Sequence, residues 1–147
     1  MSNIVASDDY IDDSLTFESF NLDQRLIQAI NKLGFKNPTL IQSKSIQLSL
    51  DEKRDIIAKA STGSGKTAAY CIPIIQSLLS DLNSNESSNN NNNKDNNKSI
   101  KSLILVPTKE LANQVYEFLN KLTIYCGFII IIIDKDNKFI KFKIFSY

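Results

Sequence analysis

The sequence contains no histidine and only two cysteines among its 147 residues. Without histidine, the chain cannot form a Ser/His or Cys/His nucleophilic relay or a zinc site with histidine ligands. The two cysteines, Cys71 and Cys126, form no CxxC pair, which argues against a disulfide framework and against a metal knuckle. We therefore expect both to be reduced, buried thiols.

Long apolar runs are also missing. The longest, residues 127–133, is far shorter than the roughly 18 residues that a membrane-spanning helix requires. The N-terminus carries aspartates at positions 8, 9, 12 and 13, whereas a secretory signal begins with basic residues. These features predict a soluble intracellular protein without a membrane segment.

The composition that remains is that of an ordinary globular protein. Hydrophobic residues make up 42% of the chain and charged residues 22%, which is enough apolar material for a packed core. The length suits one domain or a part of one. Because the net charge is only +1, no overall field attracts nucleic acid or membrane, and any polyanion must be bound at a local site.

Two amphipathic helices are predicted before residue 51. Apolar residues at helical spacing lie between Leu22 and Leu33, and Gly34 follows where a helix would end. Pro38 can begin a second helix, which would continue to about Leu50. The apolar positions are Leu22, Leu26, Ile27, Ile30 and Leu33 in the first helix and Leu40, Ile41, Ile46 and Leu48 in the second.

Strands and helices alternate after that point. The apolar segments 55–59 and 102–106 predict two short buried strands, and helices are expected over residues 68–82 and 111–122. Pro73 lacks an amide hydrogen and should kink or tighten the first of these helices. This order predicts an α/β fold in which helices cover both faces of a parallel sheet.

Three segments lie outside this pattern. Residues 1–16 are polar and acidic, and we expect a disordered lead-in. Residues 83–98 are mostly Asn, Ser and charge, with five consecutive asparagines, and predict a disordered insertion; a partner-binding tract is the alternative. Residues 128–147 form a tail rich in Ile, Lys and Phe, in which the isoleucines 129–133 predict an exposed apolar sheet edge that favours aggregation.

The most specific segment is Ala60-Ser61-Thr62-Gly63-Ser64-Gly65-Lys66-Thr67, a phosphate-binding loop with Ala in place of its first glycine. It lies between a predicted strand and a predicted helix. Its glycines let the backbone curl so that amide hydrogens point at phosphate oxygens, and the helix N-terminus adds partial positive charge. Lys66 would contact the β- and γ-phosphates, and Thr67 would bind Mg²⁺ through its hydroxyl. The alternative is a simple Gly/Ser turn. In that case Gly-Lys-Thr would occur between a strand and a helix only by chance.

A second group of residues precedes the loop and indicates which base is bound: Phe17, Gly34-Phe35, Pro38-Thr39 and Ile41-Gln42. A glutamine amide offers one donor and one acceptor, which complement the N7 acceptor and N6 donor of adenine and mismatch guanine. Phe35 could stack on the ring, and Phe17 could pack beneath the helix that holds the glutamine. Alone, each residue would more often be structural, but the phosphate loop that follows favours base recognition.

In this order and spacing, the two groups resemble the Q motif and motif I of a DEAD-box ATP-dependent RNA helicase. Pro107-Thr108-Lys109-Glu110-Leu111-Ala112 with Gln114 resembles motif Ia, so the likeness covers the first third of such a protein, from about Phe17 to Gly127. Lys109 and the stretch Leu22-Asp23-Gln24-Arg25-Leu26 look closest to the subgroup that assists large ribosomal-subunit assembly.

The resemblance implies a partial RecA-like P-loop domain over residues 17–127, with ATP and Mg²⁺ as cofactors. It also implies RNA and pre-ribosomal particles as partners and the nucleus or nucleolus as location. At a strand-to-helix junction, a lysine suits a phosphate as a point charge, although a solvated lysine is the alternative. The implied contacts are adenine at Phe35 and Gln42, phosphate along residues 61–66, magnesium at Thr67, and RNA at Pro107, Thr108 and Lys109.

Hydrolysis requires more than this cradle. An acidic motif must hold Mg²⁺ and polarise water, and an arginine usually neutralises the transferring phosphoryl group. We find neither the Asp-Glu-Ala-Asp box nor the Ser-Ala-Thr motif of the family, and Arg25 and Arg54 both precede the loop. Asp134 follows an apolar strand as that acidic motif would, but Lys135 stands where its glutamate should be. We assign no catalytic residue and expect weak ATP binding, without hydrolysis or unwinding by this chain alone.

Other interpretations stay open at this point. The chain could be a non-catalytic interaction fragment or the product of a broken gene copy, with a tail after Gly127 that lies outside the family's sequence. A different P-loop enzyme fits less well, because neither the arginine-rich lid of small kinases nor the Asn-Lys-x-Asp motif of GTPases is present.

Overall fold

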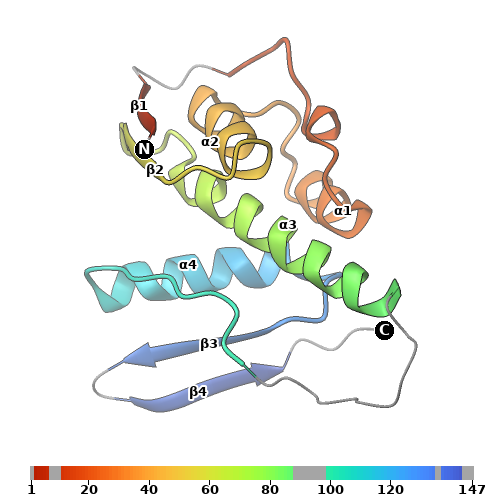
Figure 1. Ribbon diagram of the computed structural model, residues 1–147. Helices are drawn as coiled ribbons and strands as arrows, with labels where there is room; N and C mark the ends of the chain where they lie inside the picture. The colour runs from red at the N-terminus through yellow and green to blue at the C-terminus, as the bar shows by residue number, and fades with distance from the viewer. Residues whose placement is uncertain (1, 7–10, 88–98, 135–136, 144–147) are drawn as a thin grey trace.

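The computed structural model describes residues 2–6, 11–87, 99–134 and 137–143, and shows helices packed against two small sheets (Figure 1). The predicted α/β class is confirmed. In chain order the elements are β1 (Ser2–Ala6), the 3-10 helix η1 (Phe17–Phe20), α1 (Gln24–Lys32), α2 (Leu40–Leu50), β2 (Ile56–Ala60), α3 (Lys66–Ser87), α4 (Lys109–Leu122), β3 (Ile129–Asp134) and β4 (Asn137–Lys143).

Helix α1 forms where the apolar spacing predicts it. The Asp23 carboxylate caps its N-terminus by accepting a hydrogen bond of 3.0 Å from the backbone N–H of Arg25. At the other end, Gly34 has a φ of +79°, a conformation that most side chains avoid, and the helix stops there. Leu26 and Ile30 are fully buried and join the helix to the main core.

Helix α2 follows Pro38, as the sequence predicts. Its N-cap, Thr39, is extended, and the Gln42 side chain accepts a hydrogen bond of 3.0 Å from the Thr39 N–H. In return, the Thr39 side chain accepts a hydrogen bond from the Gln42 backbone N–H. This capping box fixes the first turn of the helix. Ile41 and Ile46 are buried at 1% exposure, so the helix contributes to two apolar clusters.

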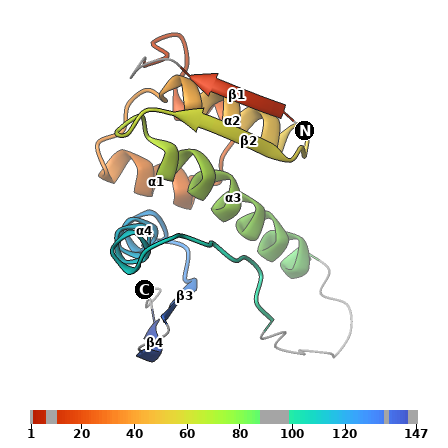
Figure 2. The same ribbon diagram turned by 90° about the vertical axis from the view of Figure 1, so that its left-hand side faces the viewer.

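Helix α3 lies at the centre of the molecule, with α2 on one side and α4 on the other (Figure 2). Its residues in the main core, Ala68, Cys71, Ile72, Ile75 and Leu79, lie at helical spacing and form one apolar face. The helix continues through Ser87, so residues 83–87 are helical where we expected disorder; residues 88–98 of that insertion lie outside the described residues. Within the described part of the chain, no helix has the length and hydropathy needed to cross a membrane.

The parallel sheet consists of β1 and β2, with Ser2 opposite Ile56 and Ala6 opposite Ala60. Residues 2–6 therefore correct the expectation of a disordered lead-in, because pairing with β2 satisfies their backbone groups. β2 itself is confirmed as a strand, but the prediction that it is buried is wrong: none of its five residues is buried, and Ile57 is 52% exposed. In the described part of the chain β2 has one neighbouring strand, and α2 packs against the pair.

Residues 102–106 correct a second expectation, since no strand is assigned there. Leu103 is 70% and Leu105 is 83% exposed, whereas Ile104 packs against the main core. This alternation is that of an extended segment with one covered side. The apolar content predicted burial on both sides, but burial of a strand requires neighbours, and the described residues supply helices on one side only.

The tail forms an antiparallel hairpin from β3 and β4, with Ile129 opposite Lys143 and an irregularity between Ile132 and Asp134. Helix α4 contacts β3. Ile129, Ile131 and Ile133 are between 46% and 68% exposed, so one side of the isoleucine strand is uncovered, as the sequence predicts. Aggregation through this surface stays a prediction.

Both cysteines are free and buried, as predicted. Burial raises the pKa of the Cys71 thiol to about 12 and that of Cys126 to about 11. A thiol with such a pKa carries almost no thiolate at neutral pH, and the thiolate is the reactive form. The two cysteines therefore act as small core residues.

A polar cluster joins the start of α1 to the second half of α3. Asp23 forms an ion pair of 2.8 Å with Arg25, and Arg25 also donates to the side-chain oxygen of Asn83 at 2.9 Å. The side-chain oxygen of Gln76 accepts a hydrogen bond of 2.8 Å from the Asp23 N–H. These bonds connect residues more than 50 positions apart and set the position of α1 along α3.

Replacing Asp23 with Asn should keep the helix cap but remove the charge that faces Arg25. We expect the free energy of unfolding to fall by about 1 kcal/mol at neutral pH, a modest value because the Arg25 side chain is 37% exposed. The measurement is urea unfolding of wild type and Asp23→Asn.

The stabilities of wild type and Asp23→Asn should also depend differently on pH. The hydrogen bonds from Arg25 hold the pKa of Asp23 well below its usual value, so its stabilisation is complete above the ordinary aspartate pKa of about 4 and is lost as the pH falls below it. The difference in stability between wild type and variant should be constant above about pH 5 and should narrow steadily as the pH falls from there toward the lowered pKa of Asp23. A difference that stays constant below about pH 5 would contradict the ion pair.

Candidate functional site

The glycine-rich loop connects the end of β2 to the start of α3, which confirms its predicted strand–loop–helix context. Gly63 and Gly65 have φ angles of +89° and +85°, which residues with a side chain rarely adopt. The two glycines let the chain curl between Ala60 and Lys66. The loop therefore ends at the N-terminus of a long helix, where backbone N–H groups have no partner within the helix.

The Lys66 ammonium group folds back over the loop. Its Nζ donates to the Ala60 carbonyl at 2.8 Å and to the Ser61 carbonyl. A lysine has three N–H donors, so one remains after these two bonds. The positive charge is held at the mouth of the loop, beside the helix N-terminus, and both favour an anion there.

Ser64 has a buried side-chain hydroxyl that is not satisfied within the described residues. The residue is 3% exposed, and its Oγ has no hydrogen-bond partner among the described residues. A buried hydroxyl without a partner costs about 1 to 3 kcal/mol, so such groups are rare unless a ligand or water completes them. A phosphate oxygen is an acceptor that this hydroxyl can use.

Two residues at the start of α2, its N-cap Thr39 and Gln42, hold the loop from behind. The Thr39 hydroxyl donates to the Ser64 carbonyl at 2.9 Å, and Gln42 Nε2 donates to the Gly65 carbonyl at 3.2 Å. In a planar trans peptide, a carbonyl and the following N–H point in opposite directions. Tying these carbonyls to α2 therefore turns the N–H groups of Gly65 and Lys66 away from α2, as a phosphate cradle requires.

Gln42 makes two hydrogen bonds within the protein that the sequence did not indicate. It is 4% exposed, its oxygen accepts from the Thr39 N–H, and its nitrogen donates to the loop. A carboxamide has two N–H donors and two oxygen lone pairs, so one donor and one acceptor remain for a base. The adenine contact stays a prediction, and the structure adds a second task for the same side chain.

Phe35 belongs to a row of stacked rings. Its ring centroid lies 6.3 Å from that of Phe17, at an interplanar angle of 28°, and 6.4 Å from that of Phe118, at 26°. We call Phe17, Phe35 and Phe118 the aromatic row. Phe17 is buried at 1% exposure and belongs to the main core. Two aromatic rings therefore already contact Phe35. The stacking of Phe35 on adenine stays a prediction.

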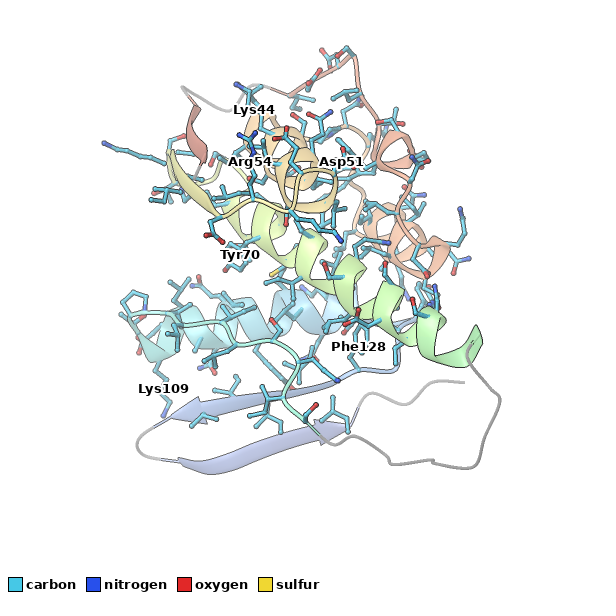
Figure 3. The ribbon with its side chains drawn as sticks, in the orientation of Figure 1. Lys44, Asp51, Arg54, Tyr70, Lys109 and Phe128 are labelled. Carbon is cyan, nitrogen blue, oxygen red and sulfur yellow. The ribbon has the colours of Figure 1, made fainter. Side chains whose placement is uncertain are left out.

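Pro107, Thr108 and Lys109 form the start of α4 and are exposed. The Thr108 hydroxyl oxygen caps the helix by accepting from the Leu111 N–H at 3.2 Å. The N-terminal ends of α3 and α4 lie on the same side of the molecule, and Figure 3 shows Lys109 at this end of α4. The structure thus places both predicted anion contacts on one side.

Sequence reasoning missed Tyr70, in the first turn of α3. Burial raises its pKa. The spacing of three residues places Thr67 and Tyr70 on one face of the helix, and this could have indicated that they are neighbours. Tyr70 therefore lies close along the helix to the predicted magnesium ligand, Thr67.

The structure offers a limited donor set for a metal. Within the described residues, no cluster of three or more Asp, Glu and Cys side chains could hold an ion. The Thr67 hydroxyl is a ligand that Mg²⁺ accepts when phosphate oxygens and water complete the shell. The predicted role of Thr67 thus fits magnesium bound together with a nucleotide.

Two surface cavities lie along α3, with volumes of about 670 and 200 Å³. The predicted site residues do not line them. The larger is lined by residues of η1, the end of α2 and the middle of α3, among them Asn21, Asp51, Arg54, Gln76 and Asp81.

Comparison with protein families matches residues 39–144 to the DEAD/DEAH box helicase family. The chain belongs to the DEAD/DEAH box helicase family. The predicted resemblance is confirmed, and the match begins at Thr39, the residue that holds the loop. It also reaches into residues 128–147, where the sequence indicated no likeness to the family.

Curated relatives of this DEAD/DEAH box chain include the ATP-dependent RNA helicase DBP9 of Debaryomyces hansenii, which is 62% identical over 118 residues. The protein of the same name from Candida albicans is 62% identical over 117 residues. Each match covers 80% of this chain but 18% of the relative. The chain thus spans about a fifth of the length of these relatives.

The fold is similar to the crystal structure of a DEAD box protein from Methanococcus jannaschii. The two are 38% identical, with a TM-score of 0.58, and the match covers 73% of this chain and 25% of the other. This neighbour supports the RecA-like α/β class predicted for the DEAD/DEAH box chain.

Gly65→Ala should be more harmful than Gly63→Ala, although both positions have positive φ. A Cβ at Gly65 would lie 2.3 Å from Gln42 Nε2, whereas one at Gly63 meets nothing within 4 Å. Each variant should lose about 1 kcal/mol through backbone strain. Gly65→Ala should lose roughly 1 to 2 kcal/mol more, because it displaces the buried amide. Thermal or urea unfolding measures the difference, and equal losses would argue against the Gln42–Gly65 contact.

Proposed function

We propose that this chain is the ATP-binding N-terminal portion of a DEAD-box RNA helicase, and that residues 60–67 hold the triphosphate. The observation that carries the proposal is the buried Ser64 hydroxyl without a partner, in a loop that Thr39 and Gln42 tie down by its carbonyls. A loop that served only as a turn would have no reason to bury an unsatisfied donor.

The phosphate contacts follow from groups already in place. The Lys66 ammonium can exchange its two carbonyl partners for oxygens of the β- and γ-phosphates without crossing the loop. The N–H groups of Gly65 and Lys66 face away from α2 and add donors. Mg²⁺, when bound, neutralises phosphate charge, and Thr67 is the residue that would hold it through its hydroxyl.

Adenine is the base that Gln42 fits best. After its bonds to Thr39 and Gly65, the amide retains one donor and one acceptor on one side chain. Adenine presents the complementary pair at N7 and N6, whereas guanine presents two acceptors on the same edge. Phe35, four residues before Thr39, would form the apolar side of the base site, and the buried Phe17 ring would support it.

RNA is the proposed second ligand, at Pro107, Thr108 and Lys109. These residues are exposed at a helix N-terminus on the same side as the phosphate loop, and such an end favours a phosphate. The relatives are named ATP-dependent RNA helicases. Action on pre-ribosomal particles, a nucleolar location and the lack of turnover by this chain alone stay predictions from the sequence.

Lys66→Ala should weaken ATP binding at least tenfold, because it removes the charge that faces the phosphates. Lys59→Ala is the matched control, since Lys59 is an exposed lysine on the strand that precedes the loop. Isothermal titration of wild type and both variants measures the effect. Equal weakening by the two changes would mean that general charge attraction, and no specific contact, binds the nucleotide.

Gln42→Glu should lower the preference for ATP over GTP by about tenfold, because a carboxylate cannot donate to adenine N7. It can still accept from the Thr39 N–H and keep the helix start, but it loses the bond to the Gly65 carbonyl, so binding of both nucleotides weakens and the ATP-to-GTP ratio is the measure of the base contact. Thr39→Val is the control: it removes the bond to the Ser64 carbonyl and should weaken ATP and GTP equally. Competition binding with both nucleotides gives the ratio. An unchanged ratio in Gln42→Glu would reject the adenine contact.

A further inference from the structure

Helix α4 contacts the connection between α1 and α2 through an aromatic side chain. Phe118 stacks on Phe35, which lies in the connection between α1 and α2. Phe118 is only partly buried, whereas Val115, one turn earlier on the same helix, is buried at 4% exposure. The stacking contact is therefore separable from the general packing of α4.

Phe35 is fixed on its other sides as well. Its backbone N–H donates to the Ile30 carbonyl of α1 at 3.3 Å, and its ring stacks on Phe17. Further along, the Pro38 carbonyl accepts from the Asp12 N–H at 2.9 Å. Phe118 adds a ring contact from α4 to these restraints. Removing the Phe118 ring should therefore shift Phe35 relative to α1 and Phe17.

Few residues separate Phe35 from the groups that hold the phosphate loop. Thr39 follows Phe35 by four residues, and Thr39 and Gln42 hold the Ser64 and Gly65 carbonyls. The space around Gln42 is tight, since a Cβ at Gly65 would meet its amide at 2.3 Å. Packed groups of this kind transmit small shifts because they cannot be compressed.

We propose that Phe118 is a positioning residue for the nucleotide site: by stacking on Phe35 it sets the place of Thr39 and Gln42 and, through them, of the phosphate loop. The other end of α4 begins at Lys109, about 14 Å away along a rigid helix at 1.5 Å per residue. The aromatic row is therefore a physical connection between the phosphate loop and the helix that carries the proposed RNA contacts. The connection between the ATP and RNA sites rests on the proposed function, whereas the positioning of the loop by Phe118 can be tested without a ligand.

The test uses the four glycines of the chain, whose amide signals in a ¹H–¹⁵N spectrum are few enough to assign by substitution. Two of them, Gly63 and Gly65, report on the loop. The full 147-residue chain is compared with Phe118→Leu, which removes the ring, Phe118→Tyr, which keeps it, and Val115→Ala, which weakens α4 packing elsewhere. Phe118→Met is a second ring-free variant, to be used if the leucine variant does not fold.

Without nucleotide, we expect the ring-free variants to shift the Gly63 and Gly65 signals, and expect Phe118→Tyr and Val115→Ala to leave them in place. With ATP added, the ring-free variants should bind about fivefold more weakly than wild type, and Val115→Ala within about twofold. Unmoved loop signals in the ring-free variants, or equal shifts in Val115→Ala, would overturn the inference.

The two proposals fail in different ways. If ATP does not move the Gly63 and Gly65 signals of the wild type, the proposed function is wrong, and the spectra without nucleotide still decide whether Phe118 positions the loop. If ATP moves these signals but the ring-free variants match the wild type with and without it, the nucleotide site stands and the role of Phe118 is rejected.

Discussion

The site depends on two hydrogen bonds from α2 to the carbonyls of Ser64 and Gly65. A glycine-rich loop has many accessible conformations, and fixing one costs conformational entropy. The bonds from Thr39 and Gln42 offset part of this cost and select the curl in which the amides face away from α2. Everything that positions the start of α2, including Pro38, the connection at Phe35 and the burial of Ile41, therefore also positions the loop.

The elements that the sequence predicted well are those with local signals. Helix α1 has an apolar stripe, a capping aspartate and a glycine at its end, and α4 has a capping threonine. The phosphate loop was predictable because its chemistry requires particular residues in a fixed order. These signals act within a few residues, so the rest of the chain does not need to be known.

What the sequence could not predict depends on distant partners. β1 forms because β2 offers a free parallel edge, and the polar sequence near the N-terminus gave no sign of that edge. Residues 102–106 have the composition of a buried strand but have neighbours on one side only. In the site, the stacking of Phe35 on Phe118 and the double use of Gln42 are tertiary contacts between segments far apart in sequence, and no periodicity encodes them.

The register of the parallel sheet has a practical consequence. Ala6 of β1 lies opposite Ala60, and the Ala60 carbonyl is a hydrogen-bond acceptor of Lys66. A short strand at the beginning of the chain thus braces the residue on which Lys66, the proposed phosphate contact, rests. Affinity tags, fusion partners or trimmed variants that disturb residues 2–6 would change the nucleotide site indirectly, so recombinant versions of this protein should leave these five residues intact.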